Sequence, residues 1–269
     1  MRFFAAVSIW LVAVALVAPV LLGWWAPPEA ITDLARLLDD QLMLTFVITG
    51  VIFLVAHAAL GYAVWQFGRK RSGPARYFEK NNRWELLWTS AAAVLFLGLT
   101  LMGYSAWAEV RFDSARAERD AESLQIEVVG QQFIWNFRYA GADGRFGPVD
   151  PELIDDSLGN PVGVDREHAD GADDIIAPRL VVPVDREITL LLKAKDVLHN
   201  FFVPEMRIKM DTVPGLVGRL PFRADTPGEY EIACSELCGL GHYRMRAYLE
   251  VVDQQRYEQW LAEQASYLP

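Results

Sequence analysis

The chain has 269 residues, of which 52% are hydrophobic, and its formal net charge is −10. A mean hydropathy of +0.14 is too high for a single soluble domain of this length, so part of the chain is predicted to lie in a membrane. The acidic balance excludes a nucleic-acid-binding protein, because the phosphate backbone is bound by positive charge.

Three apolar runs account for the hydropathy: residues 3–25, 42–67 and 86–107. Each is close to the roughly 20 residues that cross a bilayer as a helix. Within residues 1–27 we interpret the first run as a retained transmembrane helix, with a cleaved signal peptide as the alternative. Trp24 and Trp25 suit the membrane interface, and no small-residue cleavage site follows the run. Residues 28–108 are predicted to hold a transmembrane helical hairpin.

The loop between the second and third runs is basic, and it orients the hairpin. It contains one acid, Glu79, and six basic residues: Arg69, Lys70, Arg71, Arg76, Lys80 and Arg83. The positive-inside rule predicts that this loop is cytoplasmic. The remainder of the chain is therefore expected on the outer, periplasmic side of the cell (inner) membrane. The short stretch 30–40 either lies along the membrane interface or extends the second helix.

His57 lies inside the second apolar run. An ionisable group at that depth is costly and indicates a function by default. We nevertheless interpret it as a neutral imidazole that is hydrogen-bonded to a neighbouring helix.

The outer segment reads as an all-β domain over residues 109–253, followed by a C-terminal helix over 254–269. Short apolar runs separated by Gly, Pro and Asp predict a Greek-key sandwich or barrel. The predicted strands are 125–129, 133–139, 180–184, 188–192, 197–203, 207–210, 218–222, 230–234 and 245–252. In the C-terminal helix Tyr257, Trp260 and Leu261 recur at helical spacing, which predicts a face packed against the domain or the membrane surface.

One interruption of the strand pattern is long. Residues 140–178 are rich in Gly, Pro and Asp and contain no periodic apolar segment. A loop of this length is expected to be either functional or mobile. It lacks the ligand spacing of an EF-hand, and His168 is interpreted as a surface residue.

The outer segment has a large excess of acidic residues. Residues 109–269 contain 17 Lys and Arg against 29 Asp and Glu, a balance of −12. The excess is either plain solvation or a docking surface for a basic partner, whose encounter it would accelerate.

The stretch CSELCGLGHYRM, from Cys234 to Met245, gathers soft metal donors on one short loop. It contains both cysteines, together with Glu236 and His242, and His199 supplies a second imidazole upstream. Thiolate and thioether sulfur favour copper(I), and imidazole accepts either copper oxidation state. A disulfide is the alternative for the two cysteines. Zinc would leave the methionine, a weak zinc ligand, unused.

These residues resemble subunit II of the haem–copper oxidases, the subunit that carries the dinuclear CuA centre. The resemblance implies a cupredoxin-like outer domain in which two thiolates bridge two copper ions. It implies that the ligands are His199, Cys234, the carbonyl of Glu236, Cys238, His242 and Met245. In this family the Glu side chain also reaches a magnesium ion shared with the catalytic subunit, so Glu236 is a candidate for that role. Asp196 resembles an acid at the interface with that subunit, with an ordinary strand-end acid as the alternative.

The segment GQQFIWNFRYAG, residues 130–141, resembles the aromatic stretch that receives electrons from cytochrome c in this family. The family has a Trp at the position of Phe133, and Trp135 occupies the next Trp position. Either Phe133 fills the contact role, or Trp135 or another route carries the electron.

The resemblance implies a subunit of cytochrome c oxidase that relays electrons from a cytochrome c-type donor to haem in catalytic subunit I, where O2 is reduced to water. The same centre in a haem–copper nitric oxide reductase is an alternative, because nothing in this chain contacts the gas. A structural subunit without redox function is a further alternative, disfavoured by the presence of all six ligands. A tethered copper-delivery protein is the last.

Overall fold

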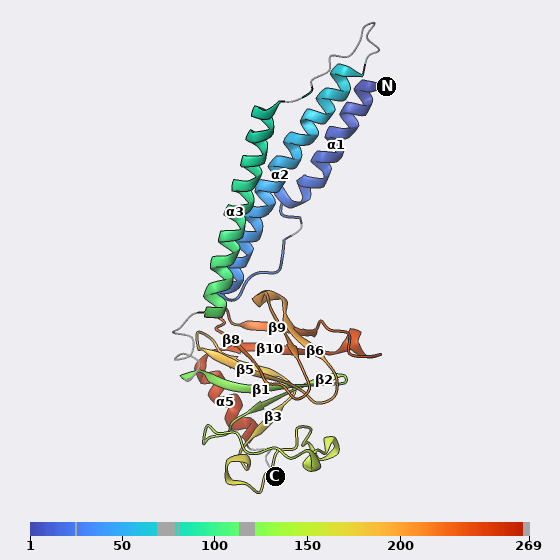
Figure 1. Ribbon diagram of the computed structural model, residues 1–269. Coiled ribbons are helices and arrows are strands. Elements are labelled where there is room, and N and C mark those ends of the chain that lie inside the picture. Colours follow the sequence, from blue (N-terminus) through green and yellow to red (C-terminus); the bar gives the residue numbers. More distant parts are fainter. Residues whose placement is uncertain (25, 69–78, 80, 113–121, 266–269) are drawn as a thin grey trace. The chain divides into compact units, whose positions relative to one another are not determined.

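The computed structural model describes residues 1–24, 26–68, 79, 81–112 and 122–265 (Figure 1). The chain divides into two compact units. One consists of Met1–Pro27 with Leu37–Phe112, and the other of Pro28–Arg36 with Asp113–Pro269.

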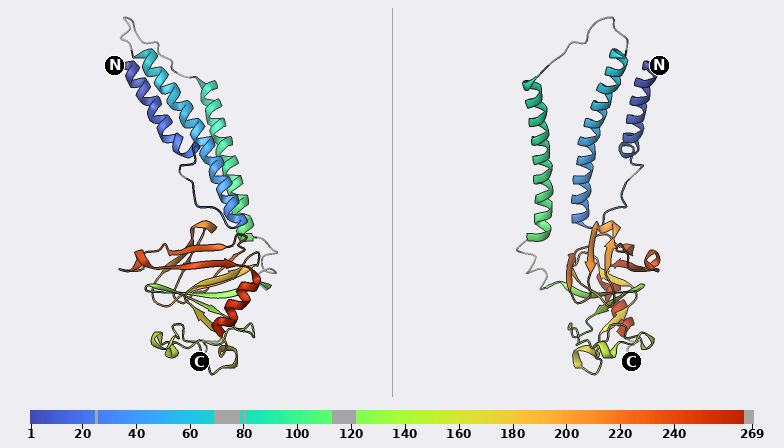
Figure 2. Two further views of the ribbon diagram at one scale, coloured as in Figure 1. Left: turned by 180° about the vertical axis from the view of Figure 1, so that it is seen from behind. Right: turned by 45° about the vertical axis from the view of Figure 1, so that its right-hand side comes forward.

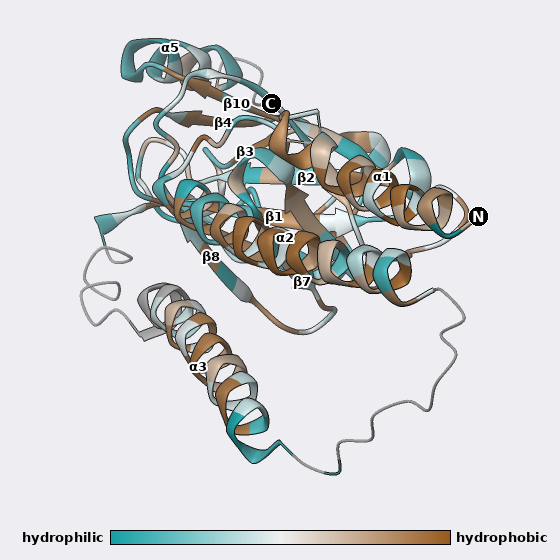
Figure 3. Cartoon of the chain, turned by 90° about the horizontal axis from the view of Figure 1, so that it is seen from above, coloured by the Kyte–Doolittle hydropathy of each residue, from teal (hydrophilic) through white to brown (hydrophobic). Residues whose placement is uncertain are grey.

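The first unit is helical. Its helices are α1 (Arg2–Leu21), α2 (Asp33–Phe67, whose first turn belongs to the second unit) and α3 (Asn82–Phe112). All three contain a stretch long and apolar enough to cross a membrane, and hydrophobic residues are coloured brown along them in Figure 3. The three predicted apolar helices are thus confirmed, and the stretch after Thr32 extends the second helix. Most of the basic loop that predicted the orientation, residues 69–78 and 80, lies outside the described residues.

Helix α1 lies beside α2 (Figure 2), and glycines of α2 face it. The indole of Trp10 lies over Gly61, where an added Cβ would come within 2.1 Å of Trp10 Nε1, and that nitrogen donates to the carbonyl of Ala58 at 3.3 Å. One further position, Gly50, faces Val17. Small residues at such crossings let helices approach closely.

His57 forms a hydrogen bond within its own helix, and the bond to a neighbouring helix stays a prediction. Its Nδ1 lies 2.8 Å from the carbonyl oxygen of Phe53, one turn earlier in α2. Because a carbonyl only accepts, Nδ1 carries the proton in this arrangement.

The second unit is a sandwich of two five-stranded sheets. The first sheet has the order β3-β2-β1-β5-β8, and the second has the order β4-β10-β9-β6-β7. The strands are β1 (Leu124–Gln131), β2 (Ile134–Tyr139), β3 (Ile175–Ala177), β4 (Leu180–Pro183), β5 (Ile188–Ala194), β6 (His199–Val203), β7 (Ile208–Thr212), β8 (Gly218–Phe222), β9 (Gly228–Cys234) and β10 (Arg246–Val252). Strands β1 and β5 are parallel, as are β4 and β10, and the other pairs are antiparallel. The predicted fold class, helices followed by an all-β sandwich, is confirmed.

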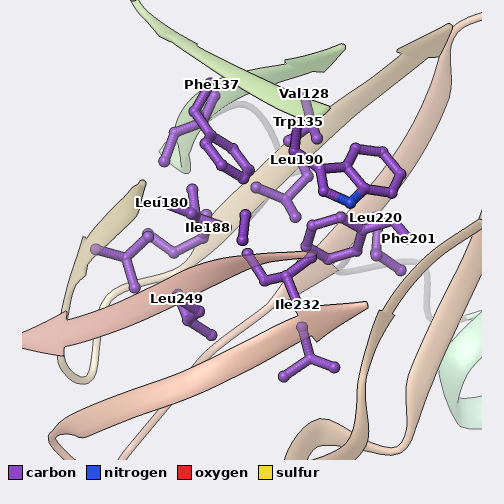
Figure 4. Close-up of a cluster of buried hydrophobic side chains, with 14 of the residues drawn as sticks. Val128, Trp135, Phe137, Leu180, Ile188, Leu190, Phe201, Leu220, Ile232 and Leu249 are labelled. Carbon is purple, nitrogen blue, oxygen red and sulfur yellow. The ribbon is translucent and has the colours of Figure 1, made fainter. Parts of the chain in front are cut away.

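The core lies between the two sheets, and both contribute to it (Figure 4). Val128, Phe137 and Leu190 come from the first sheet, and Phe201 and Leu249 from the second; each of these is at most 1% exposed. Their alternation along the strands places one side chain in two in this layer. Helix α5 (Gln254–Ala265) covers the sandwich edge, with Trp260 in edge-on contact with Tyr139 at 5.0 Å between ring centroids.

The long acidic loop is folded onto the outer face of the first sheet by one buried arginine. Arg138, 1% exposed, forms ion pairs with Glu127 and Asp174, and its guanidinium donates to the carbonyl of Gly147 at 2.6 Å. Phe146 stacks on the same group at 5.1 Å. Strand β3 falls inside the segment predicted to lack regular structure, because three residues are too few to form a recognisable apolar pattern.

Several acids of this loop form hydrogen bonds within local turns. The carboxylates of Asp143, Asp150, Asp155 and Asp165 each accept from the backbone N–H of the residue two positions later. The loop also contains three short 3-10 helices: Pro151–Leu153, Asp156–Leu158 and Ala169–Gly171. The loop is therefore built from local turns and is not simply an acidic coil.

The segment Pro28–Arg36, which includes the first turn of α2, docks on the sandwich. Ile31 is 1% exposed in the sandwich core, and its backbone N–H donates to the carbonyl of Glu205 at 3.2 Å. Arg36 forms an ion pair with Asp225, and Arg207 donates to the carbonyl of Pro28. These contacts join a linker to the β domain through both apolar and ionic contacts.

Candidate metal centre

Sheet topology gathers the candidate ligands at one end of the second sheet. Strands β10, β9 and β6 are neighbours in that sheet. Cys234 ends β9, Met245 directly precedes β10, and His199 opens β6. The backbone N–H of Cys234 donates to the carbonyl of Met245 at 3.1 Å, which closes the loop between the two strands.

The donor atoms of this loop and of His199 face one another. Sγ of Cys234 lies 3.9 Å from Sγ of Cys238 and 4.0 Å from Nδ1 of His199. Sγ of Cys238 lies 3.7 Å from Nδ1 of His242 and 3.7 Å from Sδ of Met245. The carbonyl oxygen of Glu236 lies 3.2 Å from Sγ of Cys234. The structure thus brings all six predicted donor groups together, with one imidazole beside each cysteine sulfur.

The separation of the two sulfurs fits a shared metal and not a disulfide. A disulfide bond is about 2.05 Å long, whereas these sulfurs are 3.9 Å apart and both cysteines are free. Two metal–thiolate bonds of about 2.3 Å, meeting at a tetrahedral angle, would separate the sulfurs by about 3.8 Å. Among the described residues, His199, Cys234 and Cys238 form a buried group whose ligand atoms lie within 4.8 Å of one another.

Glycines shape the loop around these donors. Gly239 has a φ of +135°, a conformation that L side chains rarely adopt. Gly130 on β1 faces the ring of His199, where an added Cβ would come within 2.8 Å of Cδ2. Each of these positions requires the absence of a side chain for the loop or the imidazole to fit.

Phe133 lies against the loop, as the resemblance led us to expect. Its ring contacts Gly241, where an added Cβ would be 2.4 Å from Phe133 Cδ2, and it is half-buried. Trp135 is 2% exposed and packs edge-on against His199 at 5.9 Å between ring centroids. Phe133 is therefore partly accessible, whereas Trp135 lies in the core (Figure 4).

Asp196 orients the imidazole of His199. Nε2 of His199 lies 2.9 Å from Oδ1 of Asp196, so Nε2–H donates to the carboxylate and Nδ1 is left free toward Cys234. Partial burial opposes ionisation of Asp196, but bonds from the backbone N–H of Gln132 and from His199 outweigh it and lower the pKa of this carboxyl.

The thiol environment favours the protonated form in the absence of metal. Burial, together with the neighbouring Cys234, raises the pKa of Cys238 to about 11. A metal ion has to displace such a proton, because the thiolate is the ligand, so binding releases protons at neutral pH.

Three contacts around the centre were not predicted from the sequence. The Gln132 side chain donates to the carbonyl of Cys238 at 2.6 Å. Ser235 donates to Asn200 at 2.6 Å, and Asn200 donates to Asp211 at 2.7 Å, which ties the loop to β6 and β7. Neutral polar residues far apart in sequence give no spacing signal. The side chain of Glu236, by contrast, is exposed as a surface ligand would be.

The chain is similar to proteins of a known family. Residues 124–252 match the profile of the family described as cytochrome c oxidase subunit II, periplasmic domain. The chain is 34% identical over 246 residues to the alternative cytochrome c oxidase subunit 2 of Bradyrhizobium diazoefficiens, covering 91% of this chain and 85% of that protein. It is 30% identical over 234 residues to cytochrome c oxidase subunit 2 of Cereibacter sphaeroides, covering 81% and 72%.

A solved structure was also found, the periplasmic domain of subunit II of cytochrome oxidase of Bradyrhizobium japonicum. It is 24% identical, covers 54% of this chain and 96% of that one, and superposes with a TM-score of 0.39.

A membrane-helix segment, a β-sandwich and a Cys–His–Met loop thus define a subunit of an oxidoreductase complex with its C-terminal domain on the outer side of a membrane. The extent of similarity to the two curated relatives shows that the chain belongs to the cytochrome c oxidase subunit 2 family.

Proposed function

We propose that this chain is the CuA-bearing subunit of a haem–copper terminal oxidase in the cell (inner) membrane, with the sandwich on the periplasmic side. It takes electrons from a cytochrome c-type donor and passes them to haem in catalytic subunit I, where O2 is reduced to water. The single observation that supports this most is the convergence of two sulfurs and two imidazole nitrogens at 3.7–4.0 Å.

The donor count favours two ions over one. Two thiolates, two imidazoles, a thioether and a carbonyl are more donors than one four-coordinate ion could use, so this set would hold two copper ions. The proposed ligands are His199, Cys234, the carbonyl of Glu236, Cys238, His242 and Met245. A single zinc ion bound by two Cys and two His would leave the thioether and the carbonyl unused.

The dinuclear copper centre, when bound, supplies a one-electron relay between donor and haem. The protein holds the donor atoms rigidly at the end of the second sheet, and a rigid ligand set keeps rearrangement small when the charge changes. Cys238 is 4% exposed and Met245 is 2% exposed, so the sandwich also shields the sulfurs from water.

Phe133 is proposed as the contact through which electrons enter, because its half-buried ring lies against the metal loop. Trp135 is proposed to support His199 from the core. The exposed carboxylate of Glu236 is proposed as a ligand to magnesium shared with the catalytic subunit, and Asp196 as an interface acid that also orients His199. Basic groups on the donor would complement the acidic sandwich.

The proposal is tested by an experiment that distinguishes electron transfer through this chain from O2 reduction in the catalytic subunit. In the purified complex, His242→Asn should lose cytochrome c-driven O2 consumption, while a small reductant that reduces the haem directly should still support it. His168→Asn, in the exposed turn of the acidic loop, is the matched control and should leave both rates unchanged.

Unchanged oxidation of cytochrome c by His242→Asn would contradict the proposal. Measuring NO and O2 consumption by the same wild-type complex decides between the oxidase and the alternative nitric oxide reductase.

A further inference from the structure

Gln132 forms hydrogen bonds to two separate loops beside the proposed metal centre. It stands in the turn between β1 and β2, and its side-chain Nε2 donates to the carbonyl oxygen of Cys238 at 2.6 Å. Its backbone N–H donates to Oδ2 of Asp196 at 2.7 Å. One residue therefore bonds to the loop between β9 and β10 and to the loop between β5 and β6.

One of these bonds is to a proposed ligand, and the other is to a residue that bonds to a proposed ligand. Cys238 is itself a ligand, so the amide bond fixes the backbone from which its sulfur projects. Asp196 accepts from Nε2 of His199 at 2.9 Å, so the backbone bond fixes the carboxylate that sets the tilt of that imidazole. The chain of contacts runs from Cys238 through Gln132 and Asp196 to His199.

The surrounding residues are shaped to admit the Gln132 amide. At Gly239 an added Cβ would come within 2.8 Å of Nε2 of Gln132, so a side chain there would displace the amide. The next residue in the turn, Phe133, covers Gly241 in the same loop. The turn between β1 and β2 thus lies against the metal loop through a hydrogen bond and a ring contact side by side.

The ligands need such a connection because they come from separate segments. His199 lies at the start of β6, whereas the other five proposed ligands lie in residues 234–245. Groups that bond to ligands set ligand orientation, and their loss changes metal affinity and redox properties without removing a ligand.

We propose that Gln132 is a positioning residue of the metal centre, which holds His199 and the Cys238 turn in a fixed relation. This inference rests on the proposed function. The adjacent Gln131 offers a matched comparison. Its amide donates to Asp156 at 3.0 Å and its carbonyl oxygen accepts from Lys195 at 3.1 Å, so its side chain bonds to the acidic loop and to the residue directly after β5 rather than to the metal loop.

The test uses the full chain and compares Gln132→Met with Gln131→Met; methionine keeps the length but cannot donate. In the metal-free chain, alkylation of Cys238 should accelerate about fivefold in Gln132→Met, the change in population that losing one ordinary hydrogen bond produces. In the copper-loaded chain, the reduction potential and the EPR hyperfine pattern should shift. Gln131→Met should match the wild type in all three measurements.

A second variant separates the loss of the hydrogen bond from a loss of side-chain packing. Gln132→Glu preserves the shape but places a carboxylate against the Cys238 carbonyl, and its effect on alkylation and potential should exceed that of Gln132→Met.

Wild-type alkylation and wild-type potential in Gln132→Met would overturn the role of Gln132 while leaving the proposed function intact. A wild-type chain with no copper signal would overturn the proposed function, and the positioning role with it.

Discussion

The ring of Phe133 lies directly on Gly241, the residue before His242. A Cβ at this glycine would come within 2.4 Å of Cδ2 and 2.5 Å of Cγ of the ring. Aromatic residue and glycine therefore fit together as one contact between the β1–β2 turn and the metal loop, and this contact makes Gly241 sensitive to any side chain.

Gly241→Ala should weaken the centre. The new methyl group has to displace the Phe133 ring, and overpacking of this kind costs about 1–3 kcal/mol. We expect lower copper retention on dialysis against a chelator and a lower thermal midpoint. Adding Phe133→Leu to Gly241→Ala should recover part of both losses, and strictly additive losses would show that the ring contact is not the cause.

Arg138 should be among the most sensitive charged positions in the sandwich. Its removal leaves the buried carboxylate of Asp174 without its ion-pair partner and leaves Glu127 paired with Lys193 alone, and breaking a buried ion pair in this way costs about 3–5 kcal/mol. Urea unfolding of Arg138→Met should show this loss, and limited proteolysis should cut within residues 140–174.

The matched control is Arg179→Met, because Arg179 and Glu229 form an exposed pair with side chains 47% and 51% accessible. Exposed pairs contribute roughly 0–1 kcal/mol. Equal losses in the two variants would contradict the role given to burial.

Acid should loosen the docked linker through Asp225. Hydrogen bonding to the Arg36 guanidinium, opposed by some burial, lowers the pKa of Asp225 below its usual value of 3.8. A carboxyl whose pKa is lower in the folded state stabilises the fold above its unfolded pKa, and this stabilisation is lost as the pH falls through the folded pKa. Asp225→Asn should therefore reduce thermal stability at pH 7, and its difference from the wild type should shrink as the pH falls below 3.8 and through the lowered pKa. A difference that does not change across the acid unfolding range would exclude this ionisation as the cause.

Helix α1 should remain in the mature chain, because it is packed against α2 rather than free. The intact mass of the purified protein should include residues 1–25. Gly61→Val should push Trp10 away and lower the thermal midpoint in detergent by roughly 3 °C or more. Gly98→Ala is the control, since an added Cβ there meets nothing within 4 Å. A mature mass that lacks the first helix would contradict retention.

Most of the fold and the metal loop could be predicted from patterns of residues close together in the sequence. The apolar runs gave the three helices, and alternating apolar residues located nine of the ten strands to within a few residues. The dense donor set from Cys234 to Met245 identified the loop because soft ligands at such short spacing have few other uses. His199 lies 35 residues before Cys234, and its role as a ligand came from the family resemblance rather than from local spacing.

Contacts that depend on the tertiary fold could not be read from the sequence. Arg138 is a charged residue in a strand and reads as exposed, yet the acidic loop buries it. Gln132 and Asn200 carry no charge and no periodic signal, so their bonds to the metal loop emerge only when β1, β6 and β9 are assembled. His57 finds its partner one turn away in its own helix, an option that the hydropathy of the run does not reveal.

Copper quantification with EPR spectroscopy on the purified full chain is the most direct test of the central claim. We predict about two copper ions per chain and a mixed-valence signal in which one unpaired electron is shared by both ions, and the signal should be absent in Cys238→Ser. A chain that binds no copper, with Cys234 and Cys238 joined as a disulfide under native conditions, would contradict the account.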